Sequence, residues 1–282
     1  MEKLKTFKSF IKESIDLNAF RKNNGKYYPE DRDELKLLME ALIEERGFEG
    51  DFNDIDTSRI TDMSHLFAFA RSFNGDISQW DTSNVTNMRR MFSSAEKFNQ
   101  SIENWEVSNV KDMGMMFMSA KSFNQPIGNW NVSNVEDMGS MFSAAEKFNQ
   151  SIENWDVSNV KIMRSMFSAA KSFNQPIGNW NISNAYYMPF MFHRAEKFNQ
   201  PIENWDVSNV KNMRSMFSFA KCFNQPIGNW DVSNVEDMEA MFHYTESFNQ
   251  DISNWNVSKE VICRDMFVNC PIKQEYKPDI KQ

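Results

Sequence analysis

The chain has 282 residues, of which 41% are apolar and 25% are charged, and its formal net charge is −8. This composition is typical of a folded protein, and no apolar run approaches the roughly 20 residues that a membrane-spanning helix needs. A pI near 5.1 argues against nucleic-acid binding, because a phosphate backbone attracts clustered Lys and Arg. Three Cys and three His are too few for a disulfide framework or a histidine-rich metal site.

The first part of the chain does not follow the pattern of the rest and predicts two helices. Apolar residues at helical spacing run from Leu4 to Ile15. A second helix is predicted from Asp31 to Arg46, with Gly47 as its C-terminal stop. Because the exposed end of a stack of repeats needs a polar outer face, residues 1–47 are expected to form a helical N-terminal cap.

Residues 48–270 follow a repeat of 25 residues, which we count as nine copies. All eight tryptophans fall at this interval: Trp80, Trp105, Trp130, Trp155, Trp180, Trp205, Trp230 and Trp255. Phe-Asn and Met-Phe pairs recur at the same interval, without any insertion or deletion. A unit this small cannot bury its own apolar face, so a solenoid of stacked coils with one continuous core is predicted.

A period of 50 residues lies on top of the first. Before the Asn-Trp pair, glutamates alternate with glycines in the order Glu103, Gly128, Glu153, Gly178, Glu203 and Gly228. The simplest interpretation is recent duplication of a block of two repeats. On that interpretation, strict repetition would reflect recent origin rather than physical demand.

Each coil is predicted to contain a short strand and a short helix, which makes the fold an α/β repeat solenoid. The helix is indicated by the apolar stripe Val135, Met138, Met141, Phe142 and Ala145, and the strand by Ile127, Trp130 and Val132. The Phe, Met and Trp columns are interpreted as core ladders. A methionine-rich copper site is disfavoured, because these thioethers lie on the apolar stripe.

Two polar columns are interpreted as structural. The asparagines from Asn74 to Asn249 are predicted to form a ladder, in which each amide bonds its own coil and the next. The Asp, Asn or Glu next to each Trp could bind calcium if the carboxylates converged. Several of these positions are amides and no calcium-loop motif accompanies them, so a solvated polar face is favoured. No metal and no cofactor is predicted.

The repeat degenerates after Phe267, and residues 271–282 are expected to form a C-terminal cap or tail. The sequence has no pairing of a nucleophile with a base, no metal-binding spacing of His or Cys and no Gly-rich phosphate loop. We therefore expect the protein not to be an enzyme.

The segment FNQPIGNWNVSNVEDMGSMFSAAEKFNQ, which begins at Phe123, resembles the 25-residue repeat of the BspA-like leucine-rich-repeat proteins, the type first catalogued in Mycoplasma lipoproteins. The resemblance covers about residues 48–270. It implies a right-handed, leucine-rich-repeat-like solenoid with a binding role, commonly in bacterial surface proteins and adhesion, and it brings no catalytic residues. Related repeats also resemble proteins of phages and large viruses.

The termini depart from the surface members of that family. Lys3, Lys5, Lys8 and Lys12 interrupt any apolar core of a signal peptide, and the last residues contain no hydrophobic anchor. The expectation is a cytoplasmic or virion-associated protein without membrane insertion, although the family is often found at the cell surface.

The leading functional hypothesis is a scaffold for protein–protein interaction or adhesion-type recognition. Departures from the repeat consensus are predicted to mark the partner-binding surface: Tyr186, Tyr187, Phe190, His193, Arg194, Phe219, His243 and Tyr244. If the coils stack, these residues form a contiguous aromatic and basic patch, and aromatic residues and Arg dominate binding hot spots. The alternative is that the aromatic residues cover a helix broken by Pro189.

Carbohydrate binding is the second hypothesis, since Trp, Asn and Asp are common in sugar sites, although all eight Trp are expected in the core. Mimicry of nucleic acid by an acidic rod is disfavoured, because Lys and Arg are interspersed through the repeats. The expected partner is therefore a protein or a glycan, and not nucleic acid.

Overall fold

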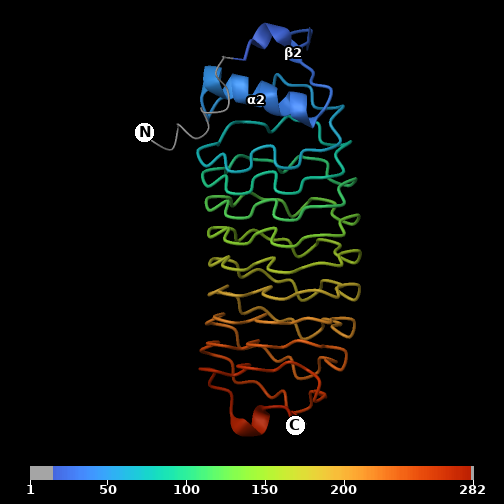
Figure 1. The fold of residues 1–282 in the computed structure, drawn as a ribbon, viewed down its shortest axis with the longest axis vertical. Helices are drawn as coiled ribbons and strands as arrows, with labels where there is room; N and C mark the ends of the chain where they lie inside the picture. The colour runs from blue at the N-terminus through green and yellow to red at the C-terminus, as the bar shows by residue number, and fades with distance from the viewer. Residues whose placement is uncertain (1–14, 281–282) are drawn as a thin grey trace.

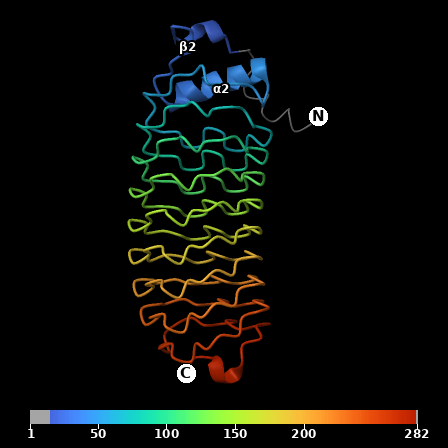
Figure 2. The ribbon, with the colours of Figure 1, turned by 180° about the vertical axis from the view of Figure 1, so that it is seen from behind.

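The computed structural model describes residues 15–280 and stacks the repeats into a long rod (Figure 1). The helix α2 (Arg32–Arg46) lies across one end of the rod, and the short 3₁₀ helix η2 (Gln274–Tyr276) lies at the opposite end. The view from behind shows the same single stack (Figure 2). The predicted repeat solenoid is confirmed as the architecture. In the described part of the chain, no helix is long and apolar enough to cross a membrane.

A hairpin precedes α2. The 3₁₀ helix η1 (Leu17–Ala19) is followed by the antiparallel strands β1 (Lys22–Asn23) and β2 (Lys26–Tyr27). Asn24 and Gly25 join these strands with φ angles of 49° and 82°. Both turn residues are therefore left-handed, which is the conformation that an Asn-Gly pair favours in a two-residue hairpin.

α2 corresponds to the second predicted helix. The Asp31 side chain accepts hydrogen bonds from the backbone N–H of Asp33 and Glu34, and Gly47 ends the helix with a φ of 80°. The buried face of α2 (Leu35, Leu38, Met39 and Leu42) joins the core and covers its N-terminal end. The helix predicted from Leu4 to Ile15 lies outside the described residues, apart from Ile15 itself.

The coils contain no helix, so the prediction of a short helix in each repeat is wrong. Between residues 48 and 273 the backbone is a series of turns, and the predicted short strand is missing as well. β pairing in these coils consists of single-residue parallel bridges between neighbours, such as the bridge from Asp112 to Asp137.

The physical reason is that the backbone N–H groups alternate between two directions. The N–H groups of Met138, Ser140 and Phe142 donate to carbonyls of the following coil at 2.7–3.0 Å. Those of Met141 and Ser143 donate to carbonyls three residues earlier in their own coil, both at 3.1 Å. An α-helix would turn every N–H along its own axis and leave none for the next coil.

Each coil makes this path possible with two residues in the left-handed region. In the repeat around Trp130 these are Ser140, with φ 57°, and Ala144, with φ 56°. The same two columns have positive φ in every coil from His65 to Asn269. A chain that turns every three residues produces nearly the same apolar spacing as a helical stripe, which explains the incorrect prediction.

The aromatic columns are core ladders, as predicted. Phe117 stacks on Phe123 in its own coil at 4.0 Å between ring centroids, and on Phe142 in the next coil at 5.7 Å. Trp155 stacks on Trp180 at 6.5 Å. Burial of these rings along the whole rod supplies the main stabilisation, because no coil has an apolar core of its own.

The asparagine ladder is also confirmed. The Asn99 side-chain oxygen accepts the backbone N–H of Asn124 at 2.8 Å, and the Asn124 side chain does the same for Asn149 at 2.9 Å. Gln125 adds a bond from its side-chain amide to the Asn99 carbonyl at 2.8 Å. These side chains satisfy turn backbone that would otherwise lack partners.

The glycines of the 50-residue period lie close to the backbone of the next coil. A Cβ atom at Gly128 would lie 2.6 Å from the carbonyl oxygen of Ser151 in the next coil, and one at Gly178 would lie 2.5 Å from that of Pro201. These distances are far inside van der Waals contact, and the obstacle is backbone. Glycine at these positions allows the next coil to approach closely. Ser78 stands at the equivalent position before the coil of Ser101, so this approach is not imposed in every second coil, and the alternation agrees with duplication of a block of two repeats.

Candidate functional site

Six of the eight residues predicted to bind a partner lie together in one cluster. They come from three neighbouring coils and form what we call the aromatic–basic patch: Phe190, His193, Arg194, Phe219, His243 and Tyr244. Each member contacts at least one other through a ring or a guanidinium group, so the patch is continuous from one coil to the next.

His193 connects the first two coils of the patch. Its ring is edge-on to Phe190 and to Phe219, with 5.8 Å between centroids in both pairs and interplanar angles of 87° and 85°. Edge-to-face geometry is one that aromatic quadrupoles favour. The imidazole is therefore held in position by rings on two sides.

Phe219 lies at the centre of the patch. Its ring stacks on Tyr244 at 5.0 Å with an interplanar angle of 3°, and His243 lies 5.6 Å away. The guanidinium carbon of Arg194 is 5.2 Å from the Phe219 centroid, within the range of a cation–π contact. The patch thus combines a positive charge with an ordered aromatic floor.

The backbone displays three of these large side chains at a strained position. Arg194, Phe219 and Tyr244 occupy the second left-handed column of their coils, with φ of 57°, 59° and 53°. The four preceding coils have small residues there: Ser94, Ser119, Ala144 and Ala169. A non-glycine residue in this region costs of order 1–3 kcal/mol when the surroundings impose it, and the large aromatic residues add crowding. The fold therefore tolerates strain where it presents these side chains.

The two histidines of the patch keep one ring nitrogen inside. Nδ1 of His193 and Nδ1 of His243 are buried and have no hydrogen-bond partner within residues 15–280. Burial, reinforced by the positive charge of Arg194, lowers the pKa of His193. His193 is consequently mostly neutral at pH 7.

Tyr186 and Tyr187 lie apart from the patch. Both are exposed, at 45% and 36%, and neither makes a ring contact with a patch residue in the described part of the chain. Tyr186 stands in a column between Lys161 and Lys211, to which its backbone is hydrogen-bonded. The sequence analysis grouped these tyrosines with the other six residues, because the repeat interval does not show in which direction neighbouring side chains point.

One exposed aromatic residue escaped the sequence analysis. Phe69 is 64% exposed and occupies the second left-handed column, the same column as Phe219 and Tyr244. The 25-residue interval leads directly from Phe219 and Tyr244 to Phe69, so the repeat alignment is the signal that could have found it. It lies several coils away from the patch and does not extend it.

The acidic column beside the tryptophans caps turns. The Asp156 carboxylate accepts the backbone N–H of Ser158 at 3.0 Å, and Asp206 does the same for Ser208. Hydrogen bonds from the Ser158 hydroxyl and N–H lower the pKa of Asp156. Within residues 15–280, no three His, Cys, Asp or Glu side chains gather as a metal ion would require.

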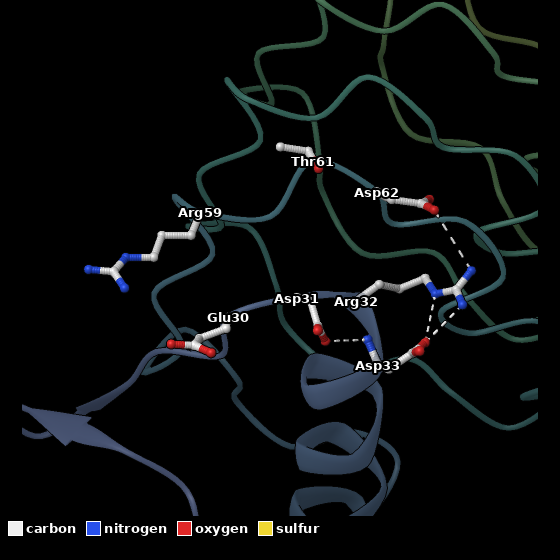
Figure 3. A pocket seen from close by; sticks show the side chains of 7 residues that line it. All are labelled: Glu30, Asp31, Arg32, Asp33, Arg59, Thr61 and Asp62. Carbon is white, nitrogen blue, oxygen red and sulfur yellow. Dashed lines mark hydrogen bonds and ion pairs between the residues drawn. The ribbon is translucent and has the colours of Figure 1, made fainter.

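A polar hollow of about 270 Å³ lies beside the start of α2 (Figure 3). Arg32 contacts Asp33 at 2.8 Å and Asp62 at 3.7 Å, and Asp31 caps the helix. The Arg59 side chain extends away from the other residues that line the hollow. The ion pair of Arg32 with Asp62 therefore joins the start of α2 to the first coil. The aromatic–basic patch remains the candidate site.

Comparisons with known proteins identify the repeat. A family model described as "Mycoplasma protein of unknown function, DUF285" matches residues 37–150, 125–210 and 179–279. None of the curated proteins matches the chain. A solved structure titled "Crystal structure of TLR13-ssRNA13 complex" is similar at 10% identity and a TM-score of 0.23, covering 85% of this chain. The chain spans 47% of that protein's length.

Proposed function

We propose that this chain, which belongs to the DUF285 family of Mycoplasma proteins, is a non-enzymatic scaffold that binds a protein partner through the aromatic–basic patch. The observation that carries this proposal is the contact of Phe219 with Arg194, His243 and Tyr244 across three coils. Aromatic residues and Arg contribute most of the energy at protein interfaces.

The cost of presenting these side chains supports the proposal. Tyr244 is 39% exposed, although it occupies a left-handed backbone position where other coils have Ser or Ala. Its exposed ring gains little from burial in the free protein, although the left-handed backbone position itself recurs in every coil. A partner that covers the ring would bury apolar surface that is now in water.

The resemblance to the BspA-like leucine-rich repeats supports two further proposals, on the winding of the solenoid and on the kind of recognition. BspA-like leucine-rich repeats imply a right-handed winding and adhesion-type recognition in a bacterial or phage setting. We extend both to this chain as proposals, together with the absence of catalysis and of nucleic-acid binding.

Carbohydrate binding has less support. Sugar sites commonly use exposed aromatic faces, and all eight Trp are only 3–4% exposed. Their indole N–H groups are already hydrogen-bonded, as for Trp180 to the Ile152 carbonyl at 3.1 Å. A glycan would therefore have to use the patch rather than the tryptophan columns.

The test is capture of partners by the full chain and by the double variant Phe219→Ser/Tyr244→Ser. Serine occupies the same column in other coils, so folding should persist. We expect the wild type to capture a defined protein and the variant to lose it at least tenfold in affinity.

The matched control is Tyr186→Ser/Tyr187→Ser, which removes two exposed aromatic residues outside the patch. We expect this control to bind the partner like the wild type. Equal loss in both variants, or retention of a glycan rather than a protein in the wild type, would contradict the proposal.

A further inference from the structure

The hydrogen bonds between coils run in one direction along one side of the rod. The backbone N–H groups of four columns, which begin at Met63, His65, Phe67 and Phe69, always donate to the coil that follows. Each column contributes eight such bonds, the last of which end on the carbonyls of Ile262, Arg264, Met266 and Val268. Four continuous chains of aligned peptide units therefore run along the solenoid.

Each chain ends at an N–H group without an acceptor. These N–H groups belong to Cys263, Asp265, Phe267 and Asn269, and none of them donates a hydrogen bond within residues 15–280. We call this row the donor edge. Aligned peptide dipoles place partial positive charge at the end where free N–H groups point, as at the start of a helix.

Up to residue 280, the C-terminal segment makes no hydrogen bond to the donor edge. Its bonds go to the other side of the last coil, where Lys273 donates to the Asn249 side chain at 3.0 Å and Ile252 donates to the Tyr276 carbonyl at 3.0 Å. Next to the donor edge, Ile262 is 48% exposed and Val268 is 39% exposed. The edge is thus a row of donors flanked by uncovered apolar side chains.

Free backbone acceptors are scarce at the donor edge, and the exposed residue Asp265 adds a carboxylate there. The carbonyls of Cys263, Asp265 and Phe267 accept N–H groups of their own coil at 3.2–3.3 Å. An ordinary β-strand presents an N–H beside each C=O on the same edge, so half of its groups would meet donors. Buried donors without acceptors are costly, and a normal strand is therefore a poor fit.

A second copy of this chain fits no better. Two donor edges brought together would oppose N–H to N–H. The complementary carbonyls, which are those of the first coil at residues 62, 64, 66 and 68, lie at the end covered by α2 (Figure 1). A helix about 10 Å across prevents another coil from approaching to the roughly 4.8 Å that pairing requires.

We propose that the donor edge binds a proline-rich extended segment of a partner protein. Proline has no backbone N–H, and its extended helix leaves carbonyls without internal hydrogen bonds, so such a segment offers acceptors almost alone. Its rings would cover Ile262 and Val268. Lys277, whose Nζ lies 5.5 Å from the Phe267 centroid, adds positive charge that favours carbonyl oxygens.

The test uses labelled decaproline as the probe and a Thr-Val peptide of the same length as its matched control. Fluorescence anisotropy measures the affinity of the full chain for both, and amide NMR locates the contact. We expect decaproline to bind at least tenfold more tightly than the Thr-Val peptide. The four donor-edge amides should shift downfield as they gain acceptors.

Two variants test whether decaproline binds at the donor edge or elsewhere on the surface. Ile262→Glu/Val268→Glu should lose decaproline at least tenfold, since both side chains are exposed and their loss leaves the core intact. The control Ile162→Glu lies in the column of Ile262, in a coil whose N–H groups are paired, and should bind normally. Equal binding of both peptides, amide shifts elsewhere, no binding, or self-association through this edge would each overturn the proposal.

Discussion

The indole N–H of Trp130 donates to the backbone carbonyl of Ile102 in the preceding coil, at 3.1 Å. The Trp105 indole makes the corresponding bond to Ile77 at 3.2 Å. Each buried tryptophan therefore forms a hydrogen bond from its own coil to the preceding coil. The four columns of backbone N–H groups bond each coil to the following one. Adhesion between coils thus has a polar component in addition to the aromatic stacks.

We expect Trp130→Phe to destabilise the rod by about 0.5–1.5 kcal/mol through the lost indole hydrogen bond, because the Ile102 carbonyl keeps the backbone N–H of Trp105 as a donor. Urea unfolding followed by circular dichroism measures the change. Tyr187→Phe removes an exposed hydroxyl and serves as the control, with no expected change. If the two variants were equally stable, the indole bond would contribute nothing.

Gly128→Ala is expected to destabilise the protein by about 1–3 kcal/mol, because its Cβ would overlap the Ser151 carbonyl. In Gly139→Ala the added Cβ would meet side-chain atoms and no backbone, the nearest being the Asp137 carboxylate at 2.9 Å and Cγ of Arg164 at 3.3 Å. We therefore expect a smaller loss for Gly139→Ala. Thermal unfolding of both variants checks the order, and the reverse order would show that the 50-residue period reflects ancestry alone.

Asn124→Ala should cost about 1–3 kcal/mol, because it leaves the part-buried N–H of Asn149 without an acceptor. Asn134 is a matched control, since its exposed side chain donates to the Ser108 carbonyl and Asn134→Ala leaves that carbonyl open to water. Denaturant midpoints compare the two. Equal midpoints would mean that the ladder is no stronger than a surface hydrogen bond.

Acid should weaken the folded state through His193. Burial lowers its pKa in the folded protein, so the unfolded chain binds more protons below its own pKa of about 6.5. The stability from neutral His193 is therefore present above that pH and is lost as the pH falls toward the lowered folded pKa. His193→Ser, a residue found in this column at Ser168 and Ser218, should reduce the fall in melting temperature between about pH 7 and pH 5. An unchanged slope would contradict this assignment.

The repeat interval predicted much of the architecture. It placed Phe123 and Trp130 in ladders, and it interpreted Asn124 as part of an amide ladder. Asp31 and Gly47 marked the ends of α2 to within a residue. These features depend on composition and spacing, which the sequence displays directly.

The backbone path of the coils was not predictable in the same way. Left-handed positions are usually signalled by Gly or Asn, and here they are filled by residues such as Ser140, Ala144 and Met115. The stacking of neighbouring coils imposes that conformation from outside the segment. The contact of Phe219 with Tyr244 could be predicted, because the two residues are one repeat of 25 residues apart. The separation of Tyr187 from them could not, because it depends on the direction in which its side chain points.

The close approach of the Ser151 carbonyl to Gly128 also limits how this gene can change length. Loss of one coil by recombination would bring a coil of the Glu103 type beneath a carbonyl that now faces glycine, and the two coils would have to move apart. Loss or gain of two coils preserves the alternation. We therefore expect a deletion of two coils to destabilise the rod less than a deletion of one coil.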